Sequence, residues 1–142
     1  MQQIIKYLLL LLLPILTLAN HVHWLGSYKK ALTKAQNENK ALLVYVIKKD
    51  STLSQKIIKD VLMNKDYVDS INQKMIAVIV SYEGRNTYPV EMYYTTVFPT
   101  LFFVNTQTET FMREPMYGEQ ISTLALLQYF QPLQLKIKLP QH

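Results

Sequence analysis

Apolar side chains along this chain follow two patterns, short uninterrupted runs and longer stretches with helical spacing. Three short apolar runs predict strands: two are uninterrupted and typical of strands buried on both faces, and the third is entered through a proline. They span residues 42–47, 75–80 and 98–104. Four other stretches place apolar residues three or four positions apart, which indicates amphipathic helices. They span residues 28–38, 51–63, 65–73 and 120–130.

The same spacing predicts which side of each helix faces the core. In the stretch 65–73 the expected inward residues are Tyr67, Val68 and Ile71. In the final stretch the expected inward residues are Ile121, Leu124, Leu127 and Phe130.

Less regular segments complete the order of elements. Residues 82–98 form a long, tyrosine-rich connection in which Pro89 could open a short helix, since proline suits the first helical turn. Residues 109–113 predict a strand antiparallel to the run 98–104. The resulting order, α-β-α-α-β-loop-β-β-α, predicts a three-layer α/β/α sandwich with a mixed central sheet.

Both ends of the chain carry distinct patterns. Residues 1–19 predict a secretory signal peptide: Lys6 precedes an apolar run, and Thr17 and Ala19 fit cleavage after Ala19. An uncleaved anchor is the alternative, and cleavage would place the protein in the periplasm. The domain then covers residues 20–132. In the tail 133–142, apolar residues alternate with polar ones, which predicts an extra strand in the chain's own sheet, in a second copy or on a partner.

Composition narrows the classes of function. The 142 residues suit one domain, and they include no cysteine, which excludes disulfides and Cys-ligated metals. The net charge of +5 comes from scattered lysines without a basic run. We therefore expect solvated surfaces, no nucleic-acid partner and no membrane contact after cleavage.

Four segments in order resemble the thioredoxin-like superfamily, in particular its periplasmic branch. They are Trp24 with the helix over 28–38, the run 42–47, the segment 54–62, and Phe98-Pro99-Thr100. The resemblance implies a thioredoxin-like fold with a cis-proline at Pro99. It also aligns Ser51 and Ser54 with the two cysteines of the CxxC motif.

Serine in place of cysteine changes the chemistry of this motif. A thiol at the start of a helix is acidified by the helix dipole, whereas a serine hydroxyl stays protonated and forms no disulfide. A serine nucleophile would need a base, but His21, His23 and His142 stand at the ends of the mature chain. We therefore expect Ser51 to act as an N-cap and Ser54 as an inert first-turn residue. No catalytic residue, metal site or cofactor is predicted, and the chain is not expected to be an enzyme.

The resemblance leaves a groove beside Pro99 as the candidate binding site. Its predicted members are Thr52, Leu53, Tyr93, Tyr94, Phe98, Pro99 and Thr100. Alternatively, Pro99 only shapes the sheet edge and the tyrosines are half-buried beneath the loop. The groove predicts a non-catalytic, chaperone-like module that holds a peptide or protein. The alternatives are a structural or dimerising protein, and a divergent member of a thiol–disulfide system that acts without its own cysteines.

Overall fold

The computed structural model describes residues 21–130, so the predicted leader and the tail 133–142 lie outside the described residues. The elements follow one another in the predicted order, with short additions. They are β1 (Trp24–Leu25), α2 (Tyr28–Asn37), β2 (Ala41–Ile47), α3 (Thr52–Ile57), a π-helical turn (Ile58–Leu62), α4 (Lys65–Lys74), β3 (Met75–Ser81), a 3-10 turn (Arg85–Thr87), β4 (Thr100–Asn105), β5 (Thr110–Phe111), β6 (Met116–Tyr117), a 3-10 turn (Gly118–Gln120) and α5 (Thr123–Phe130).

The strands form one mixed sheet in the order β1-β3-β2-β4-β5, with β6 also paired to β4. The central pair, β2 and β3, is parallel and in register from Ala41↔Met75 to Ile47↔Ser81. Strand β4 runs antiparallel to β2, with Val46 opposite Thr100. The predicted mixed sheet is therefore confirmed.

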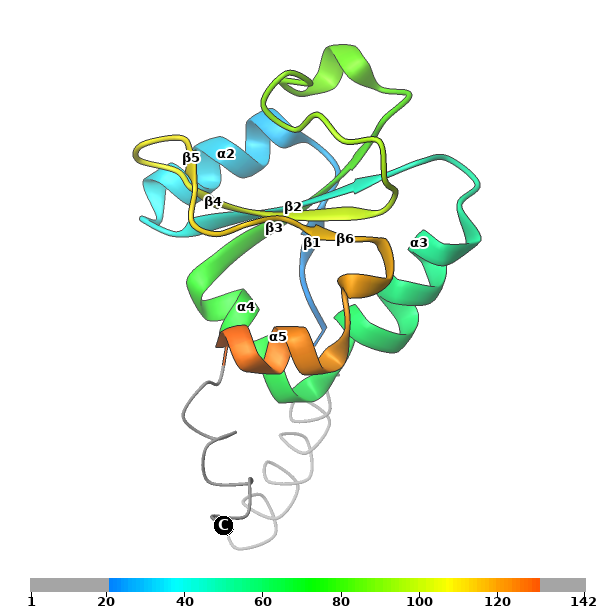
Figure 1. Cartoon of the computed structure of the whole chain (residues 1–142). Helices are drawn as coiled ribbons and strands as arrows, with labels where there is room; N and C mark the ends of the chain where they lie inside the picture. Colours follow the sequence, from blue (N-terminus) through cyan, green and yellow to red (C-terminus); the bar gives the residue numbers. More distant parts are fainter. Residues whose placement is uncertain (1–20, 131–142) are drawn as a thin grey trace, which may run out of the picture.

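Helices cover both faces of the sheet, as Figure 1 shows. On one side, α2 and the connection 82–98 cover Val44, Val78 and Phe102. On the other side, α3, α4 and α5 enclose a second cluster around Tyr45 and Phe103. This arrangement is the predicted three-layer sandwich. The inward side of α4 is also confirmed, because Tyr67, Val68 and Ile71 are all fully buried.

The final helix differs from its prediction. Leu124 was expected to face inward but is 58% exposed, whereas Leu126 is fully buried. The reason is a break in the helical phase: a 3-10 turn ends at Gln120, and α5 begins only at Thr123. Ile121 therefore belongs to the link between two helical pieces, and spacing counted from it gives the wrong face for Leu124.

Two further expectations also need correction. Pro89 opens a single turn, in which its carbonyl accepts the N–H groups of Met92 and Tyr93, and no helix follows. The predicted strand over 109–113 is regular only at Thr110–Phe111. Within residues 21–130, no helix is long and apolar enough to cross a membrane.

Candidate functional site

Three connections meet at one end of the sheet and carry the predicted site residues. The connections 48–51 and 82–84 follow the parallel strands β2 and β3, and the segment 95–99 leads into β4. Val46 at the end of β2 lies opposite Thr100, and the Tyr82 N–H donates to the Ile47 carbonyl at 2.8 Å. The end of the sheet that follows parallel strands is the usual place for a binding site in α/β folds.

Ser51 is the N-cap of α3. Its backbone is extended, and its Oγ accepts the Ser54 N–H at 3.2 Å. Such a bond satisfies one of the amide groups that the first turn of a helix leaves without a partner. The structure thus confirms the capping role predicted for Ser51.

Ser54 lies inside the fold and not on its surface. Its side chain is 2% exposed, and its Oγ has no hydrogen-bond partner among the described residues. The nearby Tyr45 hydroxyl donates to the Ser54 carbonyl at 3.0 Å, and burial raises the pKa of Tyr45. The Ser54 hydroxyl is therefore inaccessible to a substrate in this structure.

The described histidines lie elsewhere. Asn72 of α4 donates to the His21 carbonyl at 2.8 Å and accepts the His23 N–H at 3.2 Å. These contacts hold both histidines beside the end of α4 and away from the capped start of α3. No group of three or more metal-binding side chains occurs between residues 21 and 130.

Glu83 fastens the loop before Ser51 to the end of β3. Its carboxylate accepts the Lys49 N–H at 3.0 and 3.1 Å and the Ser81 hydroxyl at 2.5 Å. The Ser81 hydrogen bond, followed by that of the Lys49 amide, holds the pKa of Glu83 below its usual value. The sequence analysis did not predict a role for Glu83, because its contact with Lys49 spans 34 positions and belongs to no sequence motif.

The segment before β4 is held by its own hydrogen bonds. The Phe98–Pro99 peptide bond is cis, and the Pro99 carbonyl accepts the Gly118 N–H at 2.7 Å. The hydroxyls of Thr95 and Thr100 lie 2.9 Å apart, and that of Thr100 donates to the Val97 carbonyl at 2.5 Å. Pro99 and Thr100 are both buried, so they shape this segment without offering side chains to a partner.

Adjacent tyrosines in the preceding connection have opposite environments. Tyr93 is 1% exposed, and its hydroxyl lies 2.9 Å from that of Tyr28, so burial raises its pKa. Tyr93 belongs to the core, which contradicts its predicted place on a binding surface. Tyr94, in contrast, is 69% exposed.

The accessible part of the site is an apolar surface that we call the Pro99 face. Its side chains all come from the 82–98 connection, which follows β3: Tyr82 at its start and Tyr94, Val97 and Phe98 towards its end. Val97 is 45% exposed, and the half-buried rings of Phe98 and Tyr82 pack edge to face with centroids 5.0 Å apart. The Arg85 guanidinium lies 4.2 Å from the Tyr82 ring centroid. At the start of α3, Thr52 is exposed and Leu53 is half-buried.

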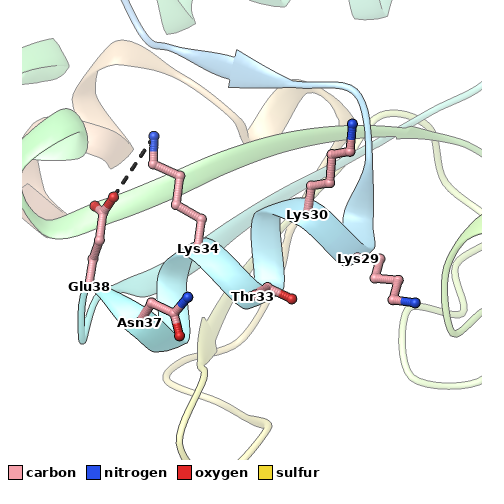
Figure 2. Close-up of a pocket in the computed structure, with 6 residues that line it drawn as sticks. All are labelled: Lys29, Lys30, Thr33, Lys34, Asn37 and Glu38. Carbon is pink, nitrogen blue, oxygen red and sulfur yellow. Dashed lines mark ion pairs between the residues drawn. The ribbon is translucent and has the colours of Figure 1, made fainter.

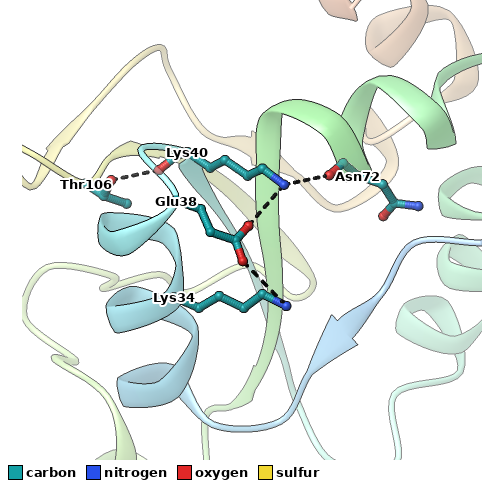
Figure 3. Close-up of polar contacts among 5 residues, drawn as sticks. All are labelled: Lys34, Glu38, Lys40, Asn72 and Thr106. Atoms are coloured by element: carbon teal, nitrogen blue, oxygen red, sulfur yellow. Dashed lines mark hydrogen bonds and ion pairs between the residues drawn. The ribbon is translucent and has the colours of Figure 1, made fainter.

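A second polar cluster lies at the other end of β2, around Lys40 (Figure 3). The Lys40 ammonium group contacts the Glu38 carboxylate at 3.1 Å and donates to the Asn72 carbonyl at 3.3 Å. The backbone carbonyl of Lys40 accepts a hydrogen bond from the Thr106 hydroxyl at 2.7 Å. One residue thus joins the ends of α2 and α4 to the turn after β4, which is a structural role.

The sheet topology and the cis-proline Pro99 define a thioredoxin-like fold, and the chain has no cysteine with which to form a CxxC motif. No protein-family profile and no curated protein matches the chain. Among solved structures, it is similar to a thioredoxin from Thermus thermophilus, with 17% identity, a TM-score of 0.65, and coverage of 81% of this chain and 88% of that one.

Two further solved structures give the same result. A putative disulphide-isomerase from Bacteroides thetaiotaomicron has 19% identity and a TM-score of 0.64, with coverage of 87% of this chain and 98% of that one. A DsbH oxidoreductase has 19% identity and a TM-score of 0.59, with coverage of 86% and 88%. The predicted thioredoxin-like fold is confirmed, and its structural relatives are mostly redox proteins, whereas this chain has no cysteine.

Proposed function

We propose that this chain is an exported, non-catalytic binding module that holds a peptide or protein segment on its Pro99 face. The observation that carries the proposal is the exposure of Tyr94 and Val97, 69% and 45%, in the short segment that leads to the half-buried Phe98. Exposed tyrosine and other large apolar side chains are typical of protein-binding surfaces. A chaperone-like or assembly role follows from such a surface.

The two serines support a role without catalysis. Ser51 is engaged as a helix cap, and the Ser54 hydroxyl is buried. The backbones of His21 and His23 are hydrogen-bonded to Asn72 of α4, whereas a serine nucleophile needs a base within hydrogen-bond reach. An insulin-reduction assay tests this part of the proposal, because turnover above background by the purified chain would contradict it.

The proposed location is the periplasm. The support is the sequence pattern of residues 1–19 together with the fold shared with disulfide-isomerase-type proteins. Mass spectrometry of the protein recovered from a periplasmic extract would test it, since the expected mature chain begins at Asn20.

The binding role is tested by capture from a periplasmic extract with the wild-type chain and two variants. Tyr94→Ala removes an exposed aromatic side chain from the Pro99 face and should weaken partner capture roughly tenfold, as expected for an interface tyrosine. Leu124→Ala is the matched control, because Leu124 is 58% exposed but lies on α5, on the other side of the sheet. Equal capture by all three proteins would place the interface elsewhere and contradict the proposal.

A further inference from the structure

We propose that the outward side of α2 binds an acidic segment of a partner protein, a function separate from that of the Pro99 face. Five side chains of this helix and that of its C-cap residue Glu38 line an open hollow of about 600 Å³, shown in Figure 2. We call this surface the α2 basic face, and its residues are Lys29, Lys30, Thr33, Lys34, Asn37 and Glu38.

The charges of this face are unbalanced. Glu38 is its single carboxylate, and that group already contacts Lys34 at 3.9 Å and Lys40 at 3.1 Å. Lys29 and Lys30 form no ion pair with any residue between 21 and 130, and both are exposed. In Figure 2, the Lys30 and Lys34 side chains rise from the same side of the helix. The face therefore presents ammonium groups without matching carboxylates.

The position of the lysines makes this imbalance unfavourable for the helix itself. The first turn of α2 contains no acidic residue, although Lys29 and Lys30 stand there. Positive charge near the positive end of a helix dipole opposes helix formation. A carboxylate docked above these lysines would offset both their mutual repulsion and their unfavourable interaction with the dipole. Helix stability alone would therefore favour acidic residues at these two positions, whereas binding of an acidic segment favours the lysines.

The chemistry of the lining favours an acidic peptide over other anionic partners. The Thr33 hydroxyl and the Asn37 amide, on the same helix face, are further hydrogen-bond donors, and a carboxylate can accept from ammonium, hydroxyl and amide groups alike. No aromatic residue lines the hollow, although base stacking is the usual basis of single-strand nucleic-acid binding. The lining also lacks the large apolar side chains that insert into a lipid surface.

The test measures binding of a fluorescein-labelled hexaglutamate peptide to the full chain by fluorescence anisotropy at low salt. The variant Lys29→Gln/Lys30→Gln/Lys34→Gln should bind roughly tenfold more weakly, the loss expected for three exposed ion pairs of ordinary strength. The control variant Lys56→Gln/Lys59→Gln/Lys65→Gln removes the same charge from exposed positions on the α3–α4 side and should bind as wild type does. Added salt should weaken binding by the wild type.

Thermal melting separates lost binding from lost folding. The α2 variant should melt no lower than wild type, because two lysines leave an unfavourable first turn. If both triple variants bound hexaglutamate equally weakly, the net charge of the protein would explain the loss of binding, and the proposal would be overturned. Binding of hexaglutamine as tightly as hexaglutamate would overturn it as well. Binding of phosphatidylglycerol vesicles or DNA through α2, without binding of hexaglutamate, would also overturn it in favour of another anionic partner.

Discussion

Alanine substitutions at Ser51 and Ser54 should change the free energy of unfolding in opposite directions. Ser51→Ala removes the Oγ that accepts the Ser54 N–H at 3.2 Å, and the loss of such a cap costs about 1 kcal/mol. Ser54→Ala removes a hydroxyl that is 2% exposed and has no hydrogen-bond partner among the described residues. A buried hydroxyl without a partner costs about 1–3 kcal/mol, so this variant should gain about 1 kcal/mol after the loss of packing around the missing oxygen.

Urea unfolding measures the difference directly. Trp24 is the single tryptophan of the chain and packs 5.8 Å from the Tyr45 ring, so its fluorescence should report unfolding of the sheet. At an unchanged m-value, the two midpoints should differ by the equivalent of about 2 kcal/mol. Ser51→Asp keeps a capping oxygen and should remain close to wild type. If Ser54→Ala were less stable than wild type by about 0.5 kcal/mol or more, its hydroxyl would have a partner and the reasoning would be refuted.

The remaining predictions concern Ser54, Tyr45 and Lys40. Ser54→Cys should be at least as stable as wild type in the same urea assay under reducing conditions, because a buried thiol behaves as a small apolar group. Tyr45→Phe removes the 3.0 Å hydrogen bond to the Ser54 carbonyl and should cost about 1 kcal/mol in that assay. Burial raises the pKa of Tyr45 above 10.0, so the stability from its neutral form is complete below pH 10 and is lost as the pH rises further. Unfolding free energies should therefore not depend on Tyr45 between about pH 8 and pH 10, and above pH 10 they should fall by up to about 1.4 kcal/mol per pH unit for each buried tyrosine whose pKa is raised in this way. Tyr45→Phe should remove one such contribution from the slope above pH 10. Lys40→Met should lower stability by about 1 kcal/mol, because it ends contacts with two elements, whereas Lys34→Met, which loses one exposed 3.9 Å ion pair, should change it by less than about 0.5 kcal/mol in thermal melts.

Sequence patterns predicted the central elements of the fold because their signals are long and local. The run 42–47 corresponds to β2 (Ala41–Ile47), and the run 75–80 corresponds to β3 (Met75–Ser81). Strands β1 and β6 went unpredicted, because each has two residues and is defined only by pairing with a distant strand. Leu124 was placed inward for a related reason: a helical period cannot reveal that a helix stops and restarts.

The role of a site residue could be predicted from the sequence where it depends only on the residue type and its immediate neighbours. Ser51 at the start of an apolar helical stretch is such a case, and its cap is present. Tyr93 and Tyr94 are the opposite case, since neighbouring residues in an irregular connection have no period that separates the buried from the exposed one. Only the packing of Tyr93 against Tyr28 and Phe102 decides which ring is accessible. Long-range contacts such as Glu83 to Lys49 likewise depend on the assembled sheet.

The environment of Ser54 bears on how this surface relates to the thiol chemistry of similar folds. A hydroxyl selected for its own chemistry would be expected to have a base or a hydrogen-bond partner, and this one has none among the described residues. A thiol in the same place would need no partner, because sulfur is a weak donor and acceptor and tolerates apolar burial. The position therefore suits a thiol better than the serine it holds, while Ser51 serves as a helix cap. Ser51 is engaged in that cap and the Ser54 hydroxyl is buried, whereas Tyr94 and Val97 of the Pro99 face are exposed.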